Sequence, residues 1–420
     1  MEMRNEGITK LRTSVLSITI KGFWLPLASL LLANAAWAAT SYKVLHDFKN
    51  SPDGAAPWAG IILGPKSNPY GTTLGGGKGD KCSGKGCGTV FELAPGGQGK
   101  WRERIIHSFD NPVDDGPWGG LVADLQRNLY GTIVGNPSYL FEATHNGGWH
   151  QFTLPDGGSW ATLSWNNGRL YGTGAAGCCG GIFRLTESGD GWAQEIIYTF
   201  HPHSGKDGTD GASPRGTPFV DGQGNLYGAT EFGGNYPPKC SSGSGGCGVV
   251  FELTPTETGE WKEHILHFFA QSPNDGQLPM YGVVMDAQGS VYGTTLQGGK
   301  SQSGIIYKLT REKTGRWKET ILYDFPNAGD GGAPSNLVFD KKGNLYGTAS
   351  GGGGTCDCGL VFKLAPSKNR TWRYTVLHYF EGYDGGEPAA GLTLDSKGNL
   401  YGTTFWGGKY LYGVVFEITP

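Results

Sequence analysis

The four residues Leu400-Tyr-Gly-Thr403 recur with small changes along almost the whole chain. The tyrosine of this string stands at seven positions, which are Tyr70, Tyr130, Tyr171, Tyr227, Tyr292, Tyr346 and Tyr401. A second string of the type Val250-Phe-Glu-Leu253 follows each copy. A third string, which usually begins with Trp and ends like Leu377-His-Tyr-Phe380, follows most of them. Motifs that recur in a fixed order indicate that one structural unit is present seven times.

Each unit predicts four short strands separated by turn residues. In the fourth unit we expect them at 216–221, 225–230, 248–253 and 261–269. The first two are joined by Asp221-Gly-Gln-Gly224, where the aspartate side chain opens the turn and the last glycine takes the positive φ that closes it. Four antiparallel strands in each of several units are typical of a β-propeller. We therefore predict an all-β fold, a seven-bladed β-propeller of four-stranded blades.

The two ends of the repeat region provide an independent argument. Residues 42–48 copy the fourth strand alone, and residues 415–418 supply the third strand of the last unit. Pairing them completes the last blade, closes the ring and removes an exposed sheet edge. The alternatives are a sandwich or a solenoid, but a solenoid needs capping repeats that neither end provides. We expect the N-terminal strand to complete the seventh blade.

The composition is unusual because 74 of the 420 residues are glycine and 23 are proline. Such a chain approaches a disordered polymer, yet 12% of its residues are aromatic and can supply the buried area that folding requires. Glycine is costly in helices, which favours an all-β protein with many turns. The net charge is −3 and Lys and Arg are scattered, which argues against a nucleic-acid partner. We expect a monomer.

The N-terminus carries the three parts of a secretory signal peptide. Basic residues come first, an apolar run follows at 23–33, and Ala36-Trp-Ala38 provides a small-residue cleavage site. The alternative is an uncleaved membrane anchor, for which the apolar run is short. We expect residues 1–38 to be a signal peptide and residues 39–420 to be a single β-propeller domain. The mature chain would be secreted or periplasmic, without a membrane span.

Eight cysteines stand in four local pairs, each between the second and third strands of a unit. An even number of paired cysteines in an exported chain predicts disulfides. The pairs are Cys82/Cys87, Cys178/Cys179, Cys240/Cys247 and Cys356/Cys358. The adjacent pair in the third unit has alternatives, since it can stay reduced or act as a redox switch. We expect no metal at the cysteines, because the pairs lack the second close pair of a tetrahedral site.

An Asp-Gly pair occurs in the segment that leads into each blade. Its aspartates are Asp53, Asp115, Asp156, Asp210, Asp275, Asp330 and Asp384. They predict either a ring of carboxylates around a ligand or seven turns that the aspartates cap. The ligand interpretation selects the first four of them as candidate binding residues.

Residues that differ between units point to a binding site more directly than residues that all units share. Trp58, Trp118 and Trp160 follow the Asp-Gly pair in the first three units, where the fourth and fifth units have Arg215 and Tyr281. We expect the tryptophans on neighbouring blades near the channel mouth, where indole rings can stack on sugar rings. The alternative is that they pack between blades.

The sequence carries no nucleophile elbow, zinc-protease motif or P-loop. Four histidines occupy the same place in the outermost strand of different units, so we expect them not to converge on one metal or substrate; they are His46, His107, His267 and His378. Asp207-Gly-Thr-Asp210 is a weak calcium signal, and we expect no other cofactor.

The motifs Gly398-Asn-Leu-Tyr-Gly-Thr-Thr404 and Gly248-Val-Val-Phe-Glu-Leu-Thr-Pro255 resemble the GloVer tandem repeat of exported bacterial proteins, the "choice-of-anchor" group. The resemblance covers nearly all of residues 41–420 and implies the fold and export, but no activity. We expect an exported binding or interaction module whose partner is a glycan or another extracellular protein. The alternatives are a glycan hydrolase or lyase that uses Asp115 and Asp210, and a structural cell-surface protein.

Overall fold

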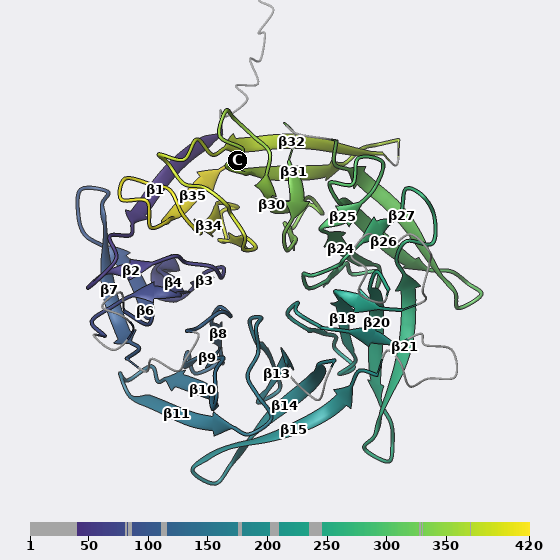
Figure 1. Cartoon of the computed structure of the whole chain (residues 1–420), viewed down its shortest axis with the longest axis horizontal. Coiled ribbons are helices and arrows are strands. Elements are labelled where there is room, and N and C mark those ends of the chain that lie inside the picture. Colours follow the sequence, from purple (N-terminus) through teal and green to yellow (C-terminus); the bar gives the residue numbers. More distant parts are fainter. Residues whose placement is uncertain are drawn as a thin grey trace, which may run out of the picture. The chain divides into compact units, whose positions relative to one another are not determined.

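The computed structural model describes residues 40–79, 82, 86–110, 116–174, 179–201, 210–234, 246–326, 329, 331–369 and 371–420. The predicted signal peptide lies outside these residues. The described residues form a ring of seven four-stranded antiparallel sheets around a channel, which confirms the predicted seven-bladed β-propeller (Figure 1). None of the described residues forms a helix with the length and apolar character needed to cross a bilayer.

Blades 1 to 4 follow one another in chain order, each with its first strand at the channel and its fourth at the rim. Blade 1 contains β3 (Ile62–Leu63), β4 (Pro69–Thr73), β6 (Thr89–Pro95) and β7 (Trp101–Ser108). Blade 2 contains β8 (Val122–Ala123), β9 (Leu129–Ile133), β10 (Ser138–Ala143) and β11 (Trp149–Leu154). Blade 3 contains β12 (Ser164–Asn166), β13 (Arg169–Gly174), β14 (Gly181–Ser188) and β15 (Gly191–Thr199). Blade 4 contains β17 (Phe219–Val220), β18 (Leu226–Thr230), β20 (Val249–Pro255) and β21 (Trp261–Phe268).

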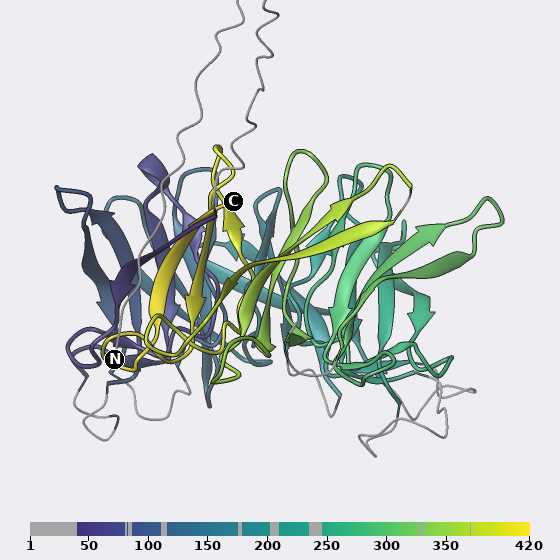
Figure 2. The ribbon, with the colours of Figure 1, turned by 90° about the horizontal axis from the view of Figure 1, so that it is seen from above.

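Blades 5 to 7 complete the ring. Blade 5 contains β23 (Val284–Met285), β24 (Val291–Thr295), β26 (Ile305–Arg311) and β27 (Trp317–Asp324). Blade 6 contains β29 (Val338–Phe339), β30 (Leu345–Gly351), β31 (Leu360–Pro366) and β32 (Trp372–Tyr379). Blade 7 contains β33 (Thr393–Leu394), β34 (Leu400–Thr404), β35 (Val414–Thr419) and β1 (Ser41–Asp47). Seen edge-on in Figure 2, the strands of each blade run between the two faces of the ring.

Short strands hold the lead-in segment of a blade, meaning the residues before its first strand, against the loop between its second and third strands. The pairs are β2 (Gly54–Ala55) with β5 (Gly75–Gly76), β16 (Gly211–Ala212) with β19 (Phe232–Gly233), and β22 (Gly276–Gln277) with β25 (Gln297–Gly298). In blade 6, β28 (Gly332–Pro334) pairs directly with β30. A 3-10 turn, η1 (Pro65–Ser67), joins β3 to β4. Lead-in segments and second-to-third loops therefore share one face, which we call the mouth face.

The N-terminal strand closes the ring as predicted. β1 pairs antiparallel with β35, from Ser41 opposite Thr419 to Asp47 opposite Val414. Blade 7 is thereby built from both ends of the repeat region (Figure 1). The pairing covers the edge of β35 that would otherwise be an exposed sheet edge.

The first strands are shorter than the sequence suggests. In blade 4 we expected 216–221, and only Phe219 and Val220 form β17. Pro218 precedes them and has no N–H to donate to a neighbouring strand. Residues 215–217, which precede Pro218, instead line the mouth of the channel.

The glycine of the recurring Tyr-Gly-Thr string makes room for an aromatic ring on the adjacent strand. A Cβ at Gly228 would lie 2.6 Å from Cζ of Phe251, whose side chain is completely buried. The same clash, at 2.7 Å or less, would arise at the other six glycines: Gly71, Gly131, Gly172, Gly293, Gly347 and Gly402. The string therefore encodes a close contact between the second and third strands of each blade.

The threonine of this string connects neighbouring blades. Thr72 of blade 1 donates to the carbonyl of Gly119 in the lead-in segment of blade 2, at 3.2 Å. Equivalent bonds run from Thr132 to Ser159, from Thr294 to Ser335, from Thr348 to Pro388 and from Thr403 to Ala59. Each such threonine is buried, so it fixes where the next lead-in segment lies.

The predicted Asp-x-x-Gly turns form as expected. The Asp221 carboxylate accepts hydrogen bonds from the backbone N–H groups of Gln223 and Asn225, and Gly224 has a φ of +87°. Its other oxygen accepts from the Asn225 amide and from the Tyr227 hydroxyl. The turn thus also anchors the tyrosine of the recurring string.

Disulfides join Cys82 to Cys87 and Cys356 to Cys358, as predicted. Cys247 is disulfide-bonded, and its predicted partner Cys240 lies outside the described residues. Cys178 also lies outside them, so the predicted pairing with Cys179 stays a prediction.

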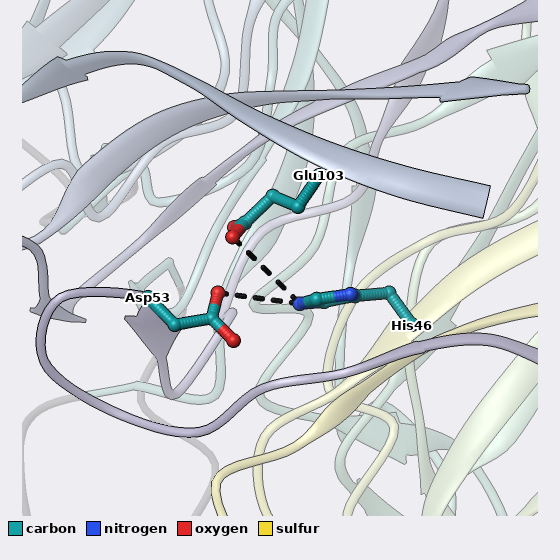
Figure 3. A group of neighbouring side chains, drawn as sticks. All are labelled: His46, Asp53 and Glu103. Atoms are coloured by element: carbon teal, nitrogen blue, oxygen red, sulfur yellow. Dashed lines mark hydrogen bonds and ion pairs between the residues drawn. The ribbon is translucent and has the colours of Figure 1, made fainter. Parts of the chain in front are cut away.

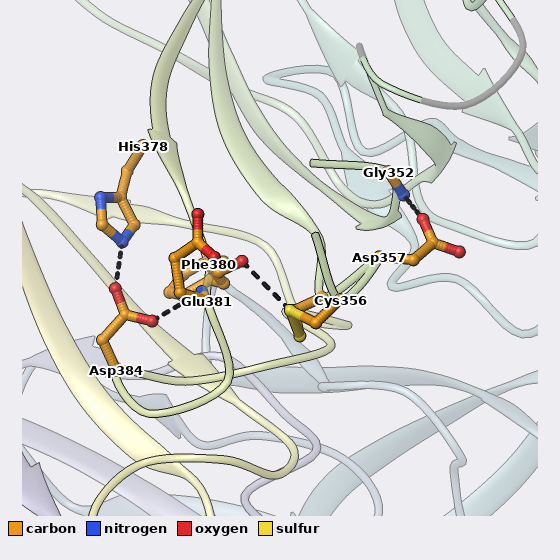
Figure 4. Close-up of a disulfide and its surroundings, with 8 residues drawn as sticks. Gly352, Cys356, Asp357, His378, Phe380, Glu381 and Asp384 are labelled. Carbon is orange, nitrogen blue, oxygen red and sulfur yellow. Dashed lines mark hydrogen bonds and ion pairs between the residues drawn. A yellow bond between two sulfur atoms is a disulfide. The ribbon is translucent and has the colours of Figure 1, made fainter. Parts of the chain in front are cut away.

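Figure 4 shows the surroundings of the disulfide in blade 6, which packs against the lead-in segment of blade 7. The Cys356 sulfur lies 3.6 Å from the Phe380 carbonyl, and the Cys358 carbonyl accepts from the Glu387 N–H at 2.8 Å.

Candidate functional site

The channel opens at the mouth face into a cavity of about 190 Å³. The lead-in segments of all seven blades line it, and buried threonines of the Tyr-Gly-Thr strings hold five of these segments at the inner edge of the ring. Six of the lining residues carry an aromatic ring, a guanidinium or an amide: Trp58, Trp118, Trp160, Arg215, Tyr281 and Asn336. These residues occupy equivalent positions in successive blades, and such positions meet at the axis of the ring. The sequence predicted this location near the channel mouth for the first five of them.

Three tryptophans form an arc along one side of the cavity, which we call the aromatic arc: Trp58, Trp118 and Trp160. The ring centroids of Trp160 and Trp118 are 5.6 Å apart, and those of Trp118 and Trp58 are 5.9 Å apart. Trp160 is 39% exposed, and the other two are half-buried. The rings thus pack on each other across blades, as in the alternative interpretation, and they also line the cavity. Stacking of these rings on a sugar stays a prediction.

Polar groups lie across the cavity from the arc. The Arg215 Nε is 2.7 Å from Oε2 of Glu231, whose pKa is raised by burial. The Asn336 side-chain oxygen accepts from the Gly282 N–H at 3.0 Å, which fixes the amide in place. Burial, together with the charge of Glu387, raises the pKa of Tyr281 to about 12, so its phenol stays neutral. This side of the mouth offers a guanidinium, an amide and a phenol as hydrogen-bonding groups.

Asp53 and Asp210, two of the candidate carboxylates, lie away from the mouth cavity. Asp53 accepts hydrogen bonds from the backbone N–H groups of Lys49 and Gly54, and Asp210 accepts from those of His201 and Gly211. These two aspartates therefore cap their own lead-in segments, and neither lines the mouth cavity.

Asp156 does not line the mouth cavity either. Asp156 is exposed, and its backbone N–H donates to the Gln194 side chain. Asp115 lies outside the described residues, as does Asp207 of the calcium signal. A ligand-binding role for any of the four carboxylates stays a prediction.

A cluster that the sequence did not reveal lies where blades 7 and 1 meet. Nε2 of His46 is 3.2 Å from Oδ1 of Asp53 and 3.9 Å from Oε2 of Glu103, which comes from the rim strand of blade 1 (Figure 3). Burial, followed by the hydrogen bond and charge of Asp53, raises the pKa of Glu103 to about 9. Although burial opposes it, hydrogen bonds from His46 and Glu103 lower the pKa of Asp53. The pKa values of the two carboxyl groups thus shift in opposite directions, as expected where like charges lie close together in a buried site.

The same cluster recurs at two other blade junctions. Nε2 of His267 lies 3.4 Å from Asp275 and 3.7 Å from Glu319. At the third junction the Tyr198 hydroxyl lies 3.4 Å from Asp210 and 3.0 Å from Glu263. Burial, and next the charge of the neighbouring aspartate, raises the pKa of Glu319 to about 7 and that of Glu263 to about 8.

Other junctions use stacked rings at these positions. Tyr42 stacks on His378, His107 on Trp149 and Tyr323 on Tyr374, with ring centroids 3.7, 3.7 and 4.0 Å apart. The histidines of the rim strands thus do not converge on one site, in line with our expectation. Each contacts the neighbouring blade instead, so these clusters join blades.

The ring of repeats and its aromatic mouth define the chain as a β-propeller repeat protein. Residues 239–420 match the family model of the Gloeobacter/Verrucomicrobia repeat. This match confirms the resemblance seen in the motifs.

No curated protein matches the chain. Among solved structures, a gluconolactonase from Xanthomonas campestris is 12% identical, with 90% of this chain and 89% of that chain covered and a TM-score of 0.40. A protein from Lactobacillus plantarum is 11% identical, with 79% and 95% covered and a TM-score of 0.48.

Proposed function

We propose that this protein is an exported binding module that recognises a sugar-like ring at the channel mouth. The observation that carries the proposal is the aromatic arc, which faces Arg215 and Asn336 across one cavity. A pyranose ring has an apolar C–H face and a rim of hydroxyl groups. Indole rings suit the first, and a guanidinium and an amide suit the second.

The size of the cavity supports a small ligand. Its volume of about 190 Å³ lies below the ~300 Å³ at which pockets for drug-sized molecules begin. One ring at a time therefore fits between the arc and the polar groups. The cavity is also built from seven separate lead-in segments on a closed ring, so it is preorganised and little conformational entropy is lost on binding.

Export is supported by the disulfides. Cys82–Cys87 and Cys356–Cys358 form in oxidising compartments and rarely persist in a cytosol. Together with the predicted signal peptide, they favour a secreted or periplasmic location.

The hydrolase or lyase alternative requires a pair of carboxylates about 5–10 Å apart that flank the bond to be cleaved. Among the described residues that line the mouth there is no aspartate or glutamate. The close pair formed by Asp53 and Glu103 lies at a blade junction, where His46 of blade 7 contacts both carboxyl groups. These observations favour binding over cleavage.

A glycan array followed by titration calorimetry tests the proposal. We expect the mature protein to bind at least one glycan, and Trp118→Ala and Trp160→Ala each to weaken that binding at least tenfold. Leu125→Ala is the control, because Leu125 is 89% exposed and does not line the mouth. Thermal unfolding would verify that each variant is folded. Absence of binding, or unchanged binding in a Trp58/Trp118/Trp160 triple alanine variant, would refute the proposal and leave the structural surface protein as the better interpretation.

A further inference from the structure

The exposed apolar side chains are concentrated on the mouth face. Of the large hydrophobic residues that the described part of the chain leaves exposed, all but Leu125 lie in or beside mouth-face loops: Trp160, Tyr379, Tyr383, Tyr410, Leu411 and Tyr412. All of these except Trp160 belong to blades 6 and 7. Exposed apolar groups gathered in one region mark a binding surface more often than single scattered ones.

The loop between β34 and β35, residues 405–413, continues the aromatic arc. The Trp58 ring contacts Phe405 with centroids 5.3 Å apart, nearly perpendicular at 87°. The Tyr412 carbonyl accepts from the Ala56 N–H at 2.9 Å. Ala56 is two residues before Trp58, about 7 Å of extended chain. The backbone of Tyr412, at the end of this loop, therefore lies within about 10 Å of the arc, on the same face.

Backbone hydrogen bonds hold this loop in a defined position. The Gly386 N–H donates to the Trp406 carbonyl at 2.9 Å, and the Gly408 N–H donates to the Gly382 carbonyl at 2.9 Å. The Lys409 N–H donates to Asp47 at 2.7 Å. Tyr410 and Tyr412 nevertheless remain 39% and 41% exposed. A fixed loop that presents exposed tyrosines can bind a ligand without first being ordered.

Two lysines, Lys409 of this loop and Lys49 beside it, flank the exposed Tyr410. The Lys49 and Lys409 ammonium groups lie 5.6 and 5.3 Å from the centre of the Tyr410 ring. Neither forms one of the ion pairs found in the described residues. At the mouth, Arg215 adds a third cation, although Glu231 pairs with it. Flat rings flanked by ammonium groups suit a ligand that combines stacking surfaces with negative charge.

We propose that the ligand is an acidic glycan chain, with one sugar at the mouth and the following sugars along residues 405–413 toward Tyr410 and Tyr412. This inference rests on the proposed function and adds the substrate class and the direction of the chain. Carboxylates on the sugars would lie beside Lys49 and Lys409, and sugar rings would stack on the two tyrosines.

Calorimetry with galacturonic acid and its oligomers of two, four and six units tests this inference. We expect the hexamer to bind at least tenfold more tightly than the monomer. Tyr410→Ala/Tyr412→Ala should reduce the affinity for the hexamer to that for the monomer and leave monomer binding unchanged. Lys49→Ala/Lys409→Ala should weaken hexamer binding and reduce its salt dependence. Trp118→Ala should weaken monomer and hexamer alike.

Each alternative outcome would contradict a specific part of this inference. If affinity does not depend on chain length, or the tyrosine variant binds the hexamer normally while Trp118→Ala does not, the extended site is wrong and the proposed mouth function stands. If neutral cellohexaose binds as tightly as the acidic hexamer, the assignment to acidic glycans is wrong. If no sugar binds at any length or on the array, the mouth function and the extended site are both wrong.

Discussion

Tyr42 lies flat on His378, with ring centroids 3.7 Å apart and ring planes within 3° of each other, and its hydroxyl donates to the Asp384 carbonyl at 2.6 Å. Tyr42 belongs to the first strand of the chain, and the other two residues belong to the junction between blades 6 and 7. This contact therefore secures the strand that closes the ring.

We expect Tyr42→Ala to lower the free energy of unfolding by about 2–4 kcal/mol, because it removes a stacked, half-buried ring and one hydrogen bond. Urea denaturation would measure the change. Ser41→Ala is the neighbouring control: Ser41 is exposed, so the change should stay within about 0.5 kcal/mol. Equal effects of the two substitutions would show that the stack does not secure β1.

Gly228→Ala should destabilise the protein by about 1–3 kcal/mol, because its Cβ would lie 2.6 Å from the Phe251 ring. Combining it with Phe251→Leu should cost less than the sum of the two single changes, since the smaller side chain gives the methyl group room. Chemical denaturation of the four proteins measures this coupling. Gly222→Ala is the control, because no atom lies within 4 Å of its added Cβ. Strict additivity would contradict the steric explanation of the Tyr-Gly-Thr string.

The free energy of unfolding should decrease as the pH rises from about 5 to about 9. Glu103 has a folded-state pKa of about 9, well above the 4.5 of a free glutamate, so its contribution is complete below pH 4.5 and is lost as the pH rises through 9. Glu263 and Glu319, with pKa values of about 8 and 7, act in the same direction. Asp53 acts in the opposite direction, since its lowered pKa adds stability that disappears only in acid.

Glu103→Gln should flatten this pH dependence, because glutamine does not titrate and can still donate to Asp53. Urea denaturation at pH 5, 7 and 9 would compare the variant with the original protein. Glu257→Gln, at an exposed position, should leave the slope unchanged. Parallel curves for all three proteins would contradict the raised pKa of Glu103.

The two cysteines of the blade 1 disulfide should respond differently to substitution. Cys82→Ser removes the bridge and only a half-buried contact with the core, and a bridge over so short a loop contributes at the low end of ~2–4 kcal/mol. Cys87→Ser also places a hydroxyl in the core beside Val90 and Phe109, which should cost about 1–3 kcal/mol more. Thermal unfolding with and without reductant separates the contribution of the disulfide from the contribution of core packing. The difference in stability between the two variants should persist in reductant. Its disappearance would contradict the proposed loss of core packing at Cys87.

Much of the fold could be predicted from the sequence because each motif encodes local geometry. Asp221 and Gly224 specify a turn, Gly228 specifies a close strand contact, and seven copies specify a ring. The mouth residues could be predicted for a related reason: Trp58, Trp118 and Arg215 occupy equivalent positions, and equivalent positions meet at the axis.

The blade junctions could not be predicted in the same way. Glu103 meets Asp53 only because the rim strand of blade 1 passes behind its own lead-in segment, and neither hydrophobic periodicity nor turn chemistry carries that information. The signal that existed was the recurrence of Glu at the third position of the Trp101, Trp261 and Trp317 strands. The lengths of the first strands were also missed, because residues such as Gly216 and Thr217 line the mouth instead of pairing in the sheet.

The pairing of β1 with β35 has a consequence for how the molecule is made. Six blades can form one after another as the polypeptide emerges, but the seventh needs residues synthesised at opposite times. Until residues 414–419 have been synthesised, β1 has no partner strand, and the ring between blades 6 and 1 stays open. Contacts this distant in sequence are the slowest to form, so the seam should close last and set the pace of maturation. If the chain crosses a membrane N-terminus first, β1 would have to avoid pairing with strands of other chains until β35 has also crossed.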